Sequence, residues 1–158
     1  MKADAAFWKT LKFFKREEQA FGRPGVNAWG DPNQIEQELL FRLDIFRAFV
    51  GKPVLIHAAW AADGHAADSA HYRGEAVDCH VQGLSLIDSW IQAERFGWGG
   101  IGLYPLWANS GLHLDVRSRG PNQAEARWWR DAAGTYQNLT SNAVYEMLQT
   151  ERARRGNS

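Results

Sequence analysis

The chain of 158 residues is 45% hydrophobic and 13% aromatic, which excludes an intrinsically disordered protein and suits one domain over residues 1–158. Its 18 basic and 18 acidic side chains balance, so no overall field favours nucleic acid or an anionic membrane surface. The single cysteine, Cys79, excludes an internal disulfide framework. No segment has the about 20 apolar residues of a spanning helix, and residues 1–19 lack the apolar core of a signal peptide. We therefore expect a soluble protein that is cytoplasmic as synthesised, with no membrane insertion and no nucleic-acid partner.

The N-terminal third of the chain predicts two helices. Apolar residues spaced among charges predict a short amphipathic helix within residues 3–20. Residues 33–50 carry the clearest helical stripe, formed by Leu, Ile and Phe side chains. Asp31 is placed to cap this second helix, with Pro32 at its first position and Gly51 at its end.

The middle of the chain predicts two strands and a further helix. Residues 53–60 are rich in apolar side chains and predict a strand, and the small polar residues 61–70 predict a flexible loop. Residues 74–81 predict the second strand. Residues 84–96 predict a core helix that ends at Gly97.

The last third predicts a hairpin followed by a helix. Residues 99–107 and 111–117 predict a pair of β-strands, and a helix begins at Ser141 and continues into the charged tail, residues 151–158. Helices gathered before and around a few short strands indicate an α+β fold, with a small antiparallel sheet flanked by helices.

Polar side chains recur on one face of two predicted strands. In residues 111–117 the alternation leaves these side chains on the same face: His113, Asp115 and Arg117. Asp78 and His80 share a face of the preceding strand in the same way. Burying imidazoles and carboxylates is costly unless they are paired, so we expect the two stretches to meet around one metal ion.

The segment that leads into Asp78 offers another histidine. His71 and Asp78 are seven positions apart, about 23 Å along a straight strand, so they can bind one ion only if the chain turns between them. Gly74 permits such a turn. Two imidazoles and one carboxylate would leave a fourth position for water, which is typical of a catalytic zinc.

Spacing alone leaves other interpretations open. The histidines can be surface residues with Asp78 as a turn or cap residue, and Asp78, His80 and His113 can form a rival ligand set. For the remaining histidines we expect a packing or supporting role for His57 and solvent exposure for His65.

Residues 69–78, SAHYRGEAVD, resemble the pattern Ser-x-His-x-x-Gly-x-Ala-x-Asp of the zinc D-Ala-D-Ala carboxypeptidase and murein endopeptidase family, whose fold is shared with the hedgehog signalling domain. Residues 99–117, GGIGLYPLWANSGLHLDVR, are similar to that family's later segment. There a Gly-rich strand and a Tyr-Pro turn lead into the strand with the last metal ligand, in a His-x-Asp variant. The resemblance covers about residues 27–130 and implies a hedgehog-like fold and a Zn²⁺ cofactor.

Carried over residue by residue, the resemblance makes His71, Asp78 and His113 the zinc ligands. Ser69 and Gly74 would support the loop of the first ligand.

Two positions depart from the family pattern. Ala61 stands where many members carry an Arg that binds substrate or stabilises charge, and Ser110 stands where many carry a Glu or Asp general base. Asp115 can substitute as the catalytic base, or can orient a metal-bound histidine. Arg117 or Arg73 can supply the missing positive charge.

Aromatic side chains suggest where a substrate lies. Trp60, Tyr104 and Trp107 either line a groove for a peptide or a sugar, or pack in the core and its rim. The expected groove lies between the 61–70 loop and the hairpin at 104–111. The complete expected substrate-binding set is Ser69, Arg73, Trp60, Tyr104 and Arg117.

The resemblance implies a zinc-dependent peptidase that cleaves peptidoglycan stem or cross-link peptides, as a carboxypeptidase or an endopeptidase. Acting on the wall would then need another export route, such as release by a phage lysis system, and a cytoplasmic dipeptidase is a further possibility. The alternatives are a non-catalytic cell-wall-binding domain that keeps the fold and a metal-free structural component of a phage particle.

Overall fold

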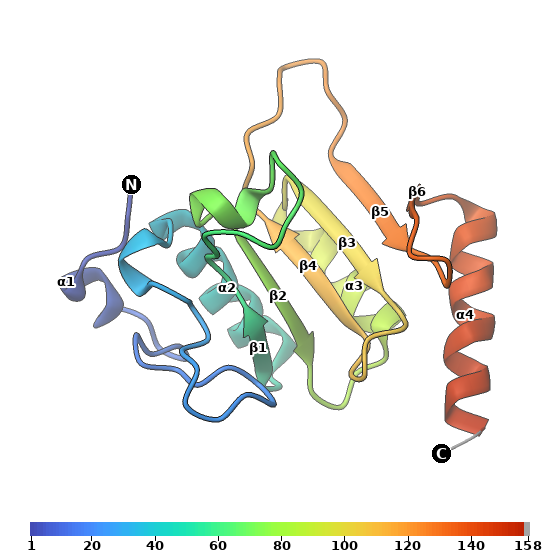
Figure 1. Ribbon diagram of the computed structural model, residues 1–158, viewed down its shortest axis with the longest axis horizontal. Helices are drawn as coiled ribbons and strands as arrows, with labels where there is room; N and C mark the ends of the chain where they lie inside the picture. Colours follow the sequence, from blue (N-terminus) through green and yellow to red (C-terminus); the bar gives the residue numbers. More distant parts are fainter. Residues whose placement is uncertain (157–158) are drawn as a thin grey trace.

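The strands form one six-stranded sheet, in the order β1-β2-β4-β3-β5-β6, in a computed structural model that describes residues 1–156 (Figure 1). Neighbouring strands are antiparallel except β3 and β5, which are parallel. The last two residues of the predicted charged tail lie outside the described residues. The strand bounds are Val54–Ala58 (β1), Ala76–Val81 (β2), Gly100–Tyr104 (β3), Gly111–Asp115 (β4), Ala126–Arg130 (β5) and Tyr136–Asn138 (β6).

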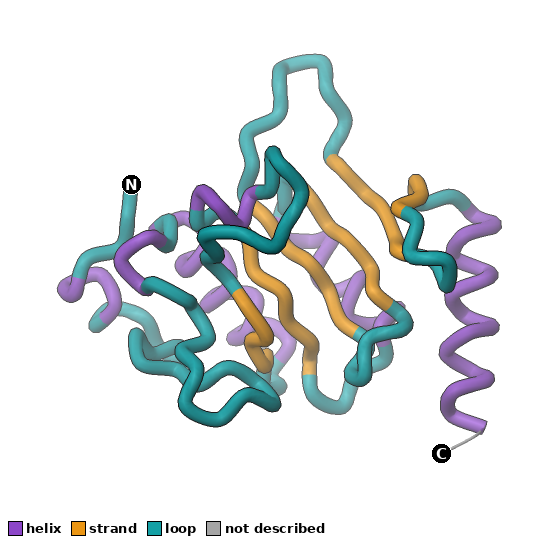
Figure 2. The backbone as a smooth tube through the Cα atoms, viewed as in Figure 1, coloured by secondary structure: helices purple, strands orange, loops and turns teal. Residues whose placement is uncertain are grey.

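The helices α2 and α3 cover one face of this sheet (Figure 1). The α-helices described within residues 1–156 are Ala5–Trp8 (α1), Gln37–Val50 (α2), Leu86–Ala93 (α3) and Ser141–Gly156 (α4). Short 3-10 helices span Pro32–Gln34 (η1), Ala70–Arg73 (η2) and Glu94–Phe96 (η3). Figures 1 and 2 show α2 and α3 behind the sheet, with η2 and the loop before it in front. A mixed fold with a mostly antiparallel sheet is compatible with the predicted α+β class.

The two central helices follow their sequence signals. The Asp31 side chain caps η1, and α2 ends at Gly51, which has a left-handed backbone with φ of 63°. Ile35 and Glu36 are extended, so the predicted helix is split between η1 and α2. The predicted helix over residues 84–96 is confirmed as α3 and η3, which end at Gly97.

The predicted N-terminal helix is wrong beyond α1. Trp8 and Phe14 both pack against Trp29, with ring centroids 5.1 Å and 5.7 Å from it. A continuous helix would turn about 600° over six residues and point these two rings in different directions. The chain leaves the helix instead, and the Asp44 carboxylate accepts hydrogen bonds from the backbone N–H groups of residues 12 and 13.

Alternation along the central strands separates a core face from a polar face, as predicted. The face toward the helices carries side chains that are almost fully buried: Val77, Cys79, Ile101, Leu103, Leu112 and Leu114. The opposite face carries Asp78, His113 and Asp115. The sheet therefore presents its polar residues to the side on which η2 lies.

Strands β5 and β6 and the packing of α4 were not predicted from the sequence. Trp129 of β5 is buried in the core, and α4 is fixed through its buried Met147. Arg154 of α4 donates hydrogen bonds to the carbonyls of Pro105, Trp107 and Ala108, in the turn between β3 and β4. Over residues 1–156, no helix has both the length and the apolar character to cross a bilayer.

Candidate metal centre

Three side chains from separate elements converge on the polar face of the sheet. Asp78 of β2 and His113 of β4 are direct partners in the antiparallel ladder, so the strand register itself brings them together. His71 comes from η2, where the Ser69 hydroxyl oxygen accepts a hydrogen bond from the His71 backbone N–H. The turn between His71 and Asp78, predicted at Gly74, is present.

Gly74 is the residue that allows η2 to end where it does. Its φ is 67°, in the left-handed region, and its N–H bonds back to the carbonyls of Ala70 and His71. A Cβ atom at this position would lie 1.8 Å from the carbonyl oxygen of Gln34. Any other residue would therefore displace η2 and with it the first histidine.

Two imidazole nitrogens and one carboxylate oxygen form a small triangle. His71 Nε2 and His113 Nδ1 lie 3.1 Å apart, His113 Nδ1 and Asp78 Oδ1 lie 3.1 Å apart, and His71 Nε2 and Asp78 Oδ1 lie 3.3 Å apart. Ligand atoms about 2.0–2.2 Å from a tetrahedral ion are spaced by about 3.3–3.6 Å. The three side chains are therefore placed to hold a metal ion.

Hydrogen bonds behind the triangle orient both imidazoles. His71 Nδ1–H donates to the carbonyl of Ala59 at 2.5 Å, which leaves Nε2 as the nitrogen that faces the other ligands. His113 Nε2–H donates to Asp115 Oδ2 at 2.9 Å, which leaves Nδ1 to face Asp78. Arg117 Nε in turn donates to Asp115 Oδ2 at 2.7 Å. Outer partners of this kind fix the tautomer and the ring angle of metal-binding histidines.

Burial and pairing set the charges of the cluster. Burial opposes ionisation of Asp78, but hydrogen bonds from His113 and His71 outweigh it and hold the pKa of Asp78 well below its usual range. Burial alone would lower the pKa of His113, yet its hydrogen bonds with Asp115 and Asp78 raise that pKa to about 9. Asp115 is also buried, and its hydrogen bonds with His113 and Arg117 lower its pKa to about 2. The carboxylates are thus ionised and ready to balance a cation.

Two glycines of β3 make room for the residues that surround His113. A Cβ atom at Gly100 would lie 2.3 Å from an Asp115 carboxylate oxygen, and one at Gly102 would lie 2.5 Å from the Trp128 indole. Gly102 pairs directly with His113, and Gly100 pairs with Asp115. The Gly-rich stretch of the sequence therefore provides a surface without side chains against which Asp115 and Trp128 pack.

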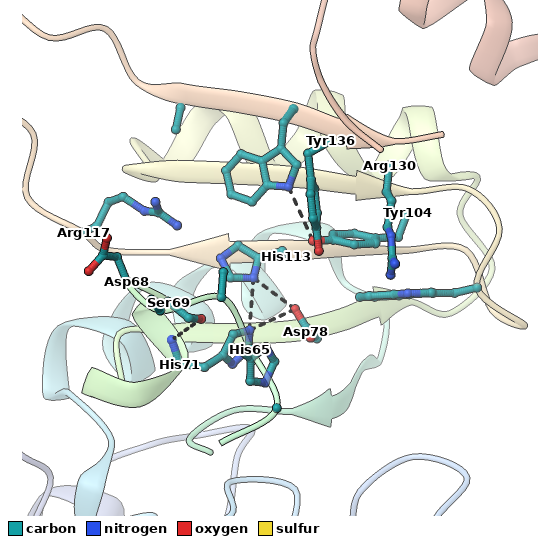
Figure 3. Close-up of a pocket in the computed structure, with 16 residues that line it drawn as sticks. His65, Asp68, Ser69, His71, Asp78, Tyr104, His113, Arg117, Arg130 and Tyr136 are labelled. Atoms are coloured by element: carbon teal, nitrogen blue, oxygen red, sulfur yellow. Dashed lines mark hydrogen bonds and ion pairs between the residues drawn. The ribbon is translucent and has the colours of Figure 1, made fainter. Parts of the chain in front are cut away.

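The triangle opens onto a cleft of about 700 Å³ (Figure 3). One wall is the loop of residues 64–69, from which the ring of His65 stacks on His71 with centroids 4.2 Å apart. The other wall is aromatic and comes from β3, β5, β6 and the β3–β4 turn: Tyr104, Trp107, Trp128 and Tyr136. Arg117 and Arg130 also line the cleft. A ligand that reaches the ion thus meets both walls.

The expected substrate-binding residues divide into two groups. Ser69, Tyr104 and Arg117 line the cleft. Trp60 instead packs against the core beside Gly30, and Arg73 is exposed and pairs with Glu75 at 2.8 Å. The structure therefore does not bring Trp60 or Arg73 to the cleft.

Asp115 and Ser110 occupy positions that bear on the missing base. Asp115 is completely buried and lies on the far nitrogen of His113, so its position fits the orienting role rather than proton transfer in the cleft. The Ser110 hydroxyl donates to the carbonyl of Pro105 and accepts a hydrogen bond from Arg154. Ser110 lines a separate pocket beside His80, away from the three ligands.

The rival ligand set does not form. His80 Nδ1 lies 2.6 Å from His57 Nε2, and the two rings pack edge to face with centroids 4.9 Å apart. On β2, His80 faces Leu55 of β1, two positions beyond the pairing of Asp78 with His113. His57 is thus a packed histidine, as expected.

Sequence reasoning missed four residues of the cleft. His65 was expected to be solvated, and although exposed it stacks on a ligand. Trp128, Arg130 and Tyr136 belong to the unpredicted strands β5 and β6. The one available signal was the position of His65, six residues before His71 in a loop of small residues.

No protein-family model matches the chain, and no curated protein matches it at a significant level.

Proposed function

We propose that this protein is a zinc-dependent peptidase that cleaves peptidoglycan stem or cross-link peptides. The observation that carries the proposal is the triangle of His71, Asp78 and His113 at the floor of an open cleft. Structural zinc sites are closed by four protein ligands, whereas catalytic sites have three and keep one position open. Nitrogen and oxygen donors at these spacings suit zinc.

The family resemblance supports the same function. The residues that it implies as ligands are the three that lie together in the fold. The hedgehog-like fold, the zinc cofactor and the peptidoglycan substrate are parts of this proposal, because each depends on the resemblance of residues 69–78 and 99–117.

The chemistry required is hydrolysis of an amide. The oxygen of water bonds to the carbonyl carbon, the C–N bond breaks, and a proton from the water passes to the leaving amine. Zinc, when bound, polarises the carbonyl and lowers the pKa of water toward about 7. Asp115 holds His113 in place, and Asp68 and His65 on the loop wall are the side chains placed to accept and return the proton.

Digestion of isolated murein tests the proposal. Zinc-loaded protein should clear murein in a zymogram and release peptide fragments with new termini, identified by mass spectrometry. His71→Ala, Asp78→Ala and His113→Ala should each lose zinc and clearing, whereas Gln92→Ala on the far helix α3 serves as a control that keeps both. Intact murein after treatment with zinc-loaded protein, or full activity in any ligand variant, would contradict the proposal.

A second function is favoured by the surroundings of Ser110. The base position that the resemblance implies is occupied by Ser110, which has no carboxylate, and its hydroxyl is bound by Arg154 away from the metal centre. A domain that binds wall peptides without cutting them would keep the fold and the metal. Co-sedimentation with murein in the absence of any clearing would support this function over hydrolysis.

A further inference from the structure

Three aromatic side chains that carry hydrogen-bond donors meet in the wall of the cleft. Tyr104, Trp128 and Tyr136 come from three neighbouring strands and line the same cleft as the metal ligands. Trp128 Nε1–H donates a hydrogen bond to the Tyr104 hydroxyl oxygen at 3.4 Å. Figure 3 shows the hydroxyl groups of Tyr104 and Tyr136 pointing toward one another. We call these three residues the hydroxyl cluster.

Trp128 lies against a metal ligand, and Trp128 and Tyr104 are both packed against neighbouring groups. The Trp128 ring centroid is 5.2 Å from that of His113, and the indole lies over Gly102 with no room for a Cβ between them. The Tyr104 ring stacks on Trp107, with centroids 4.2 Å apart and planes 17° from parallel. Packing on both sides therefore fixes where the Tyr104 hydroxyl points.

The hydroxyl cluster has one more proton to donate than it can use internally. The N–H of Trp128 and the hydroxyls of Tyr104 and Tyr136 are three donors. The N–H uses the hydroxyl oxygen of Tyr104, and the two hydroxyls, which point toward one another, can share at most one hydrogen bond between them. At least one O–H is therefore free to donate outside the cluster, to water or to an oxygen atom of a ligand in the cleft.

Two guanidinium groups strengthen these donors. Arg117 lies 5.5 Å from the centroid of the Trp128 ring, and Arg130 lies 5.5 Å from that of Tyr136. A cation against the face of an aromatic ring draws on its electrons and polarises the N–H or O–H that the ring carries. Burial raises the pKa of Tyr104, so its hydroxyl keeps its proton across the neutral range.

We propose that the hydroxyl cluster donates a hydrogen bond to the scissile carbonyl oxygen as that atom gains negative charge, an inference that rests on the proposed peptidase function. Many members of the family that the chain resembles stabilise charge with an arginine at the position of Ala61. In this protein Tyr104 and Tyr136 take over that role. Donors fixed in advance stabilise a developing oxyanion, and loss of one typically lowers kcat by about 10²–10³-fold.

Single-oxygen deletions test this role. Tyr104→Phe and Tyr136→Phe are compared with wild type and with Tyr145→Phe, a control on α4 that is 64% exposed and lies outside the cleft. The measurements are zinc content, kcat and KM on a stem peptide, and calorimetric affinity for a phosphinate analogue that mimics the tetrahedral, charged state. An uncleavable peptide with a reduced scissile bond reports ground-state binding.

We expect Tyr104→Phe to keep one zinc, to lose about 10²-fold in kcat with KM nearly unchanged, and to bind the phosphinate correspondingly less tightly. Tyr136→Phe should change the same quantities in the same direction, while Tyr145→Phe matches wild type. Equal phosphinate affinity in wild type and both cluster variants would overturn the inference. If wild type and both cluster variants cleave the peptide equally well, the inference about the hydroxyl cluster is overturned and the peptidase function stands. A zinc-loaded wild type that neither cleaves nor binds the phosphinate would overturn both.

Discussion

His113 donates from Nε2 to Asp115, on the side of the imidazole that faces away from Asp78. The carboxylate is completely buried and is itself held by Arg117, so it has one orientation available. A carboxylate fixed in this way makes Nδ1 more basic and points it at the place where an ion would bind.

We expect Asp115→Asn to lower zinc affinity by about 10–100-fold while the fold is retained. The amide can no longer stabilise the proton on Nε2 by charge, and Arg117 loses its partner. Competition with a chromogenic chelator measures the change. Asp63→Asn makes the same chemical change at an exposed position outside the lining of the cleft, and its zinc affinity should match that of wild type. Equal affinity in both variants would show that Asp115 does not support the ligand.

Zinc binding should release about one proton from His113 at pH 7. In the metal-free protein its hydrogen bonds raise the pKa of His113 to about 9, so the ring is protonated at neutral pH and must lose that proton to bind an ion. Apparent zinc affinity therefore rises about tenfold per pH unit from pH 7 and levels off above pH 9. Calorimetry in buffers of different ionisation enthalpy counts the protons. Heats at pH 7 that do not depend on the buffer would contradict this assignment.

His65 is expected to carry the proton during turnover. Its ring stacks on His71 in the cleft, and burial together with the nearby His71 lowers its pKa, so it is neutral and able to accept a proton at pH 7. His65→Ala should lower kcat by about 10²-fold or more, within the usual range for general acid–base residues. Zinc content should be unchanged, because His65 is not one of the three ligands. Wild-type turnover in this variant would assign proton transfer to another residue.

The His57–His80 pair should make stability depend on pH between 4 and 6.5. Burial, aided by His57, lowers the pKa of His80 from its ordinary 6.5 to about 4. Over that interval the unfolded chain binds the proton and the folded chain does not, so the free energy of unfolding falls as the pH falls. Urea unfolding of metal-free protein at several pH values measures this slope. His80→Gln should flatten it, and an unchanged slope in that variant would exclude the pair as its source.

Local patterns were sufficient for much of the fold. The helical stripe over residues 33–50 and the alternation in 111–117 depend on neighbours in the sequence, and the greater part of each appears where predicted, as α2 (Gln37–Val50) and β4 (Gly111–Asp115). The structure of residues 3–20 could not be predicted from local spacing. The packing of Trp8 and Phe14 against Trp29 is a long-range effect that overrides helical periodicity. Strand β5 was missed because its pairing with β3 is parallel and joins distant parts of the chain.

The candidate site divides along the same line. Alternation alone places His113 and Asp115 on one face. The turn at Gly74 follows because His71 and Asp78 are too far apart along a straight strand to bind one ion. The contact of His65 with His71 and the meeting of Tyr136 with Tyr104 could not be predicted. Each depends on how loops or edge strands fold back over the sheet, which no local periodicity encodes.

The pairing of Asp78 with His113 across β2 and β4 has a kinetic consequence. Backbone hydrogen bonds of the ladder keep these two ligands at working separation with or without an ion. His71, by contrast, lies outside the sheet, in the short 3-10 helix η2 between Ser69 and Gly74. The rates at which the ion binds and leaves are therefore limited by the opening of η2. We expect a Ser69→Ala variant to exchange metal faster than wild type, with the register of the sheet unchanged.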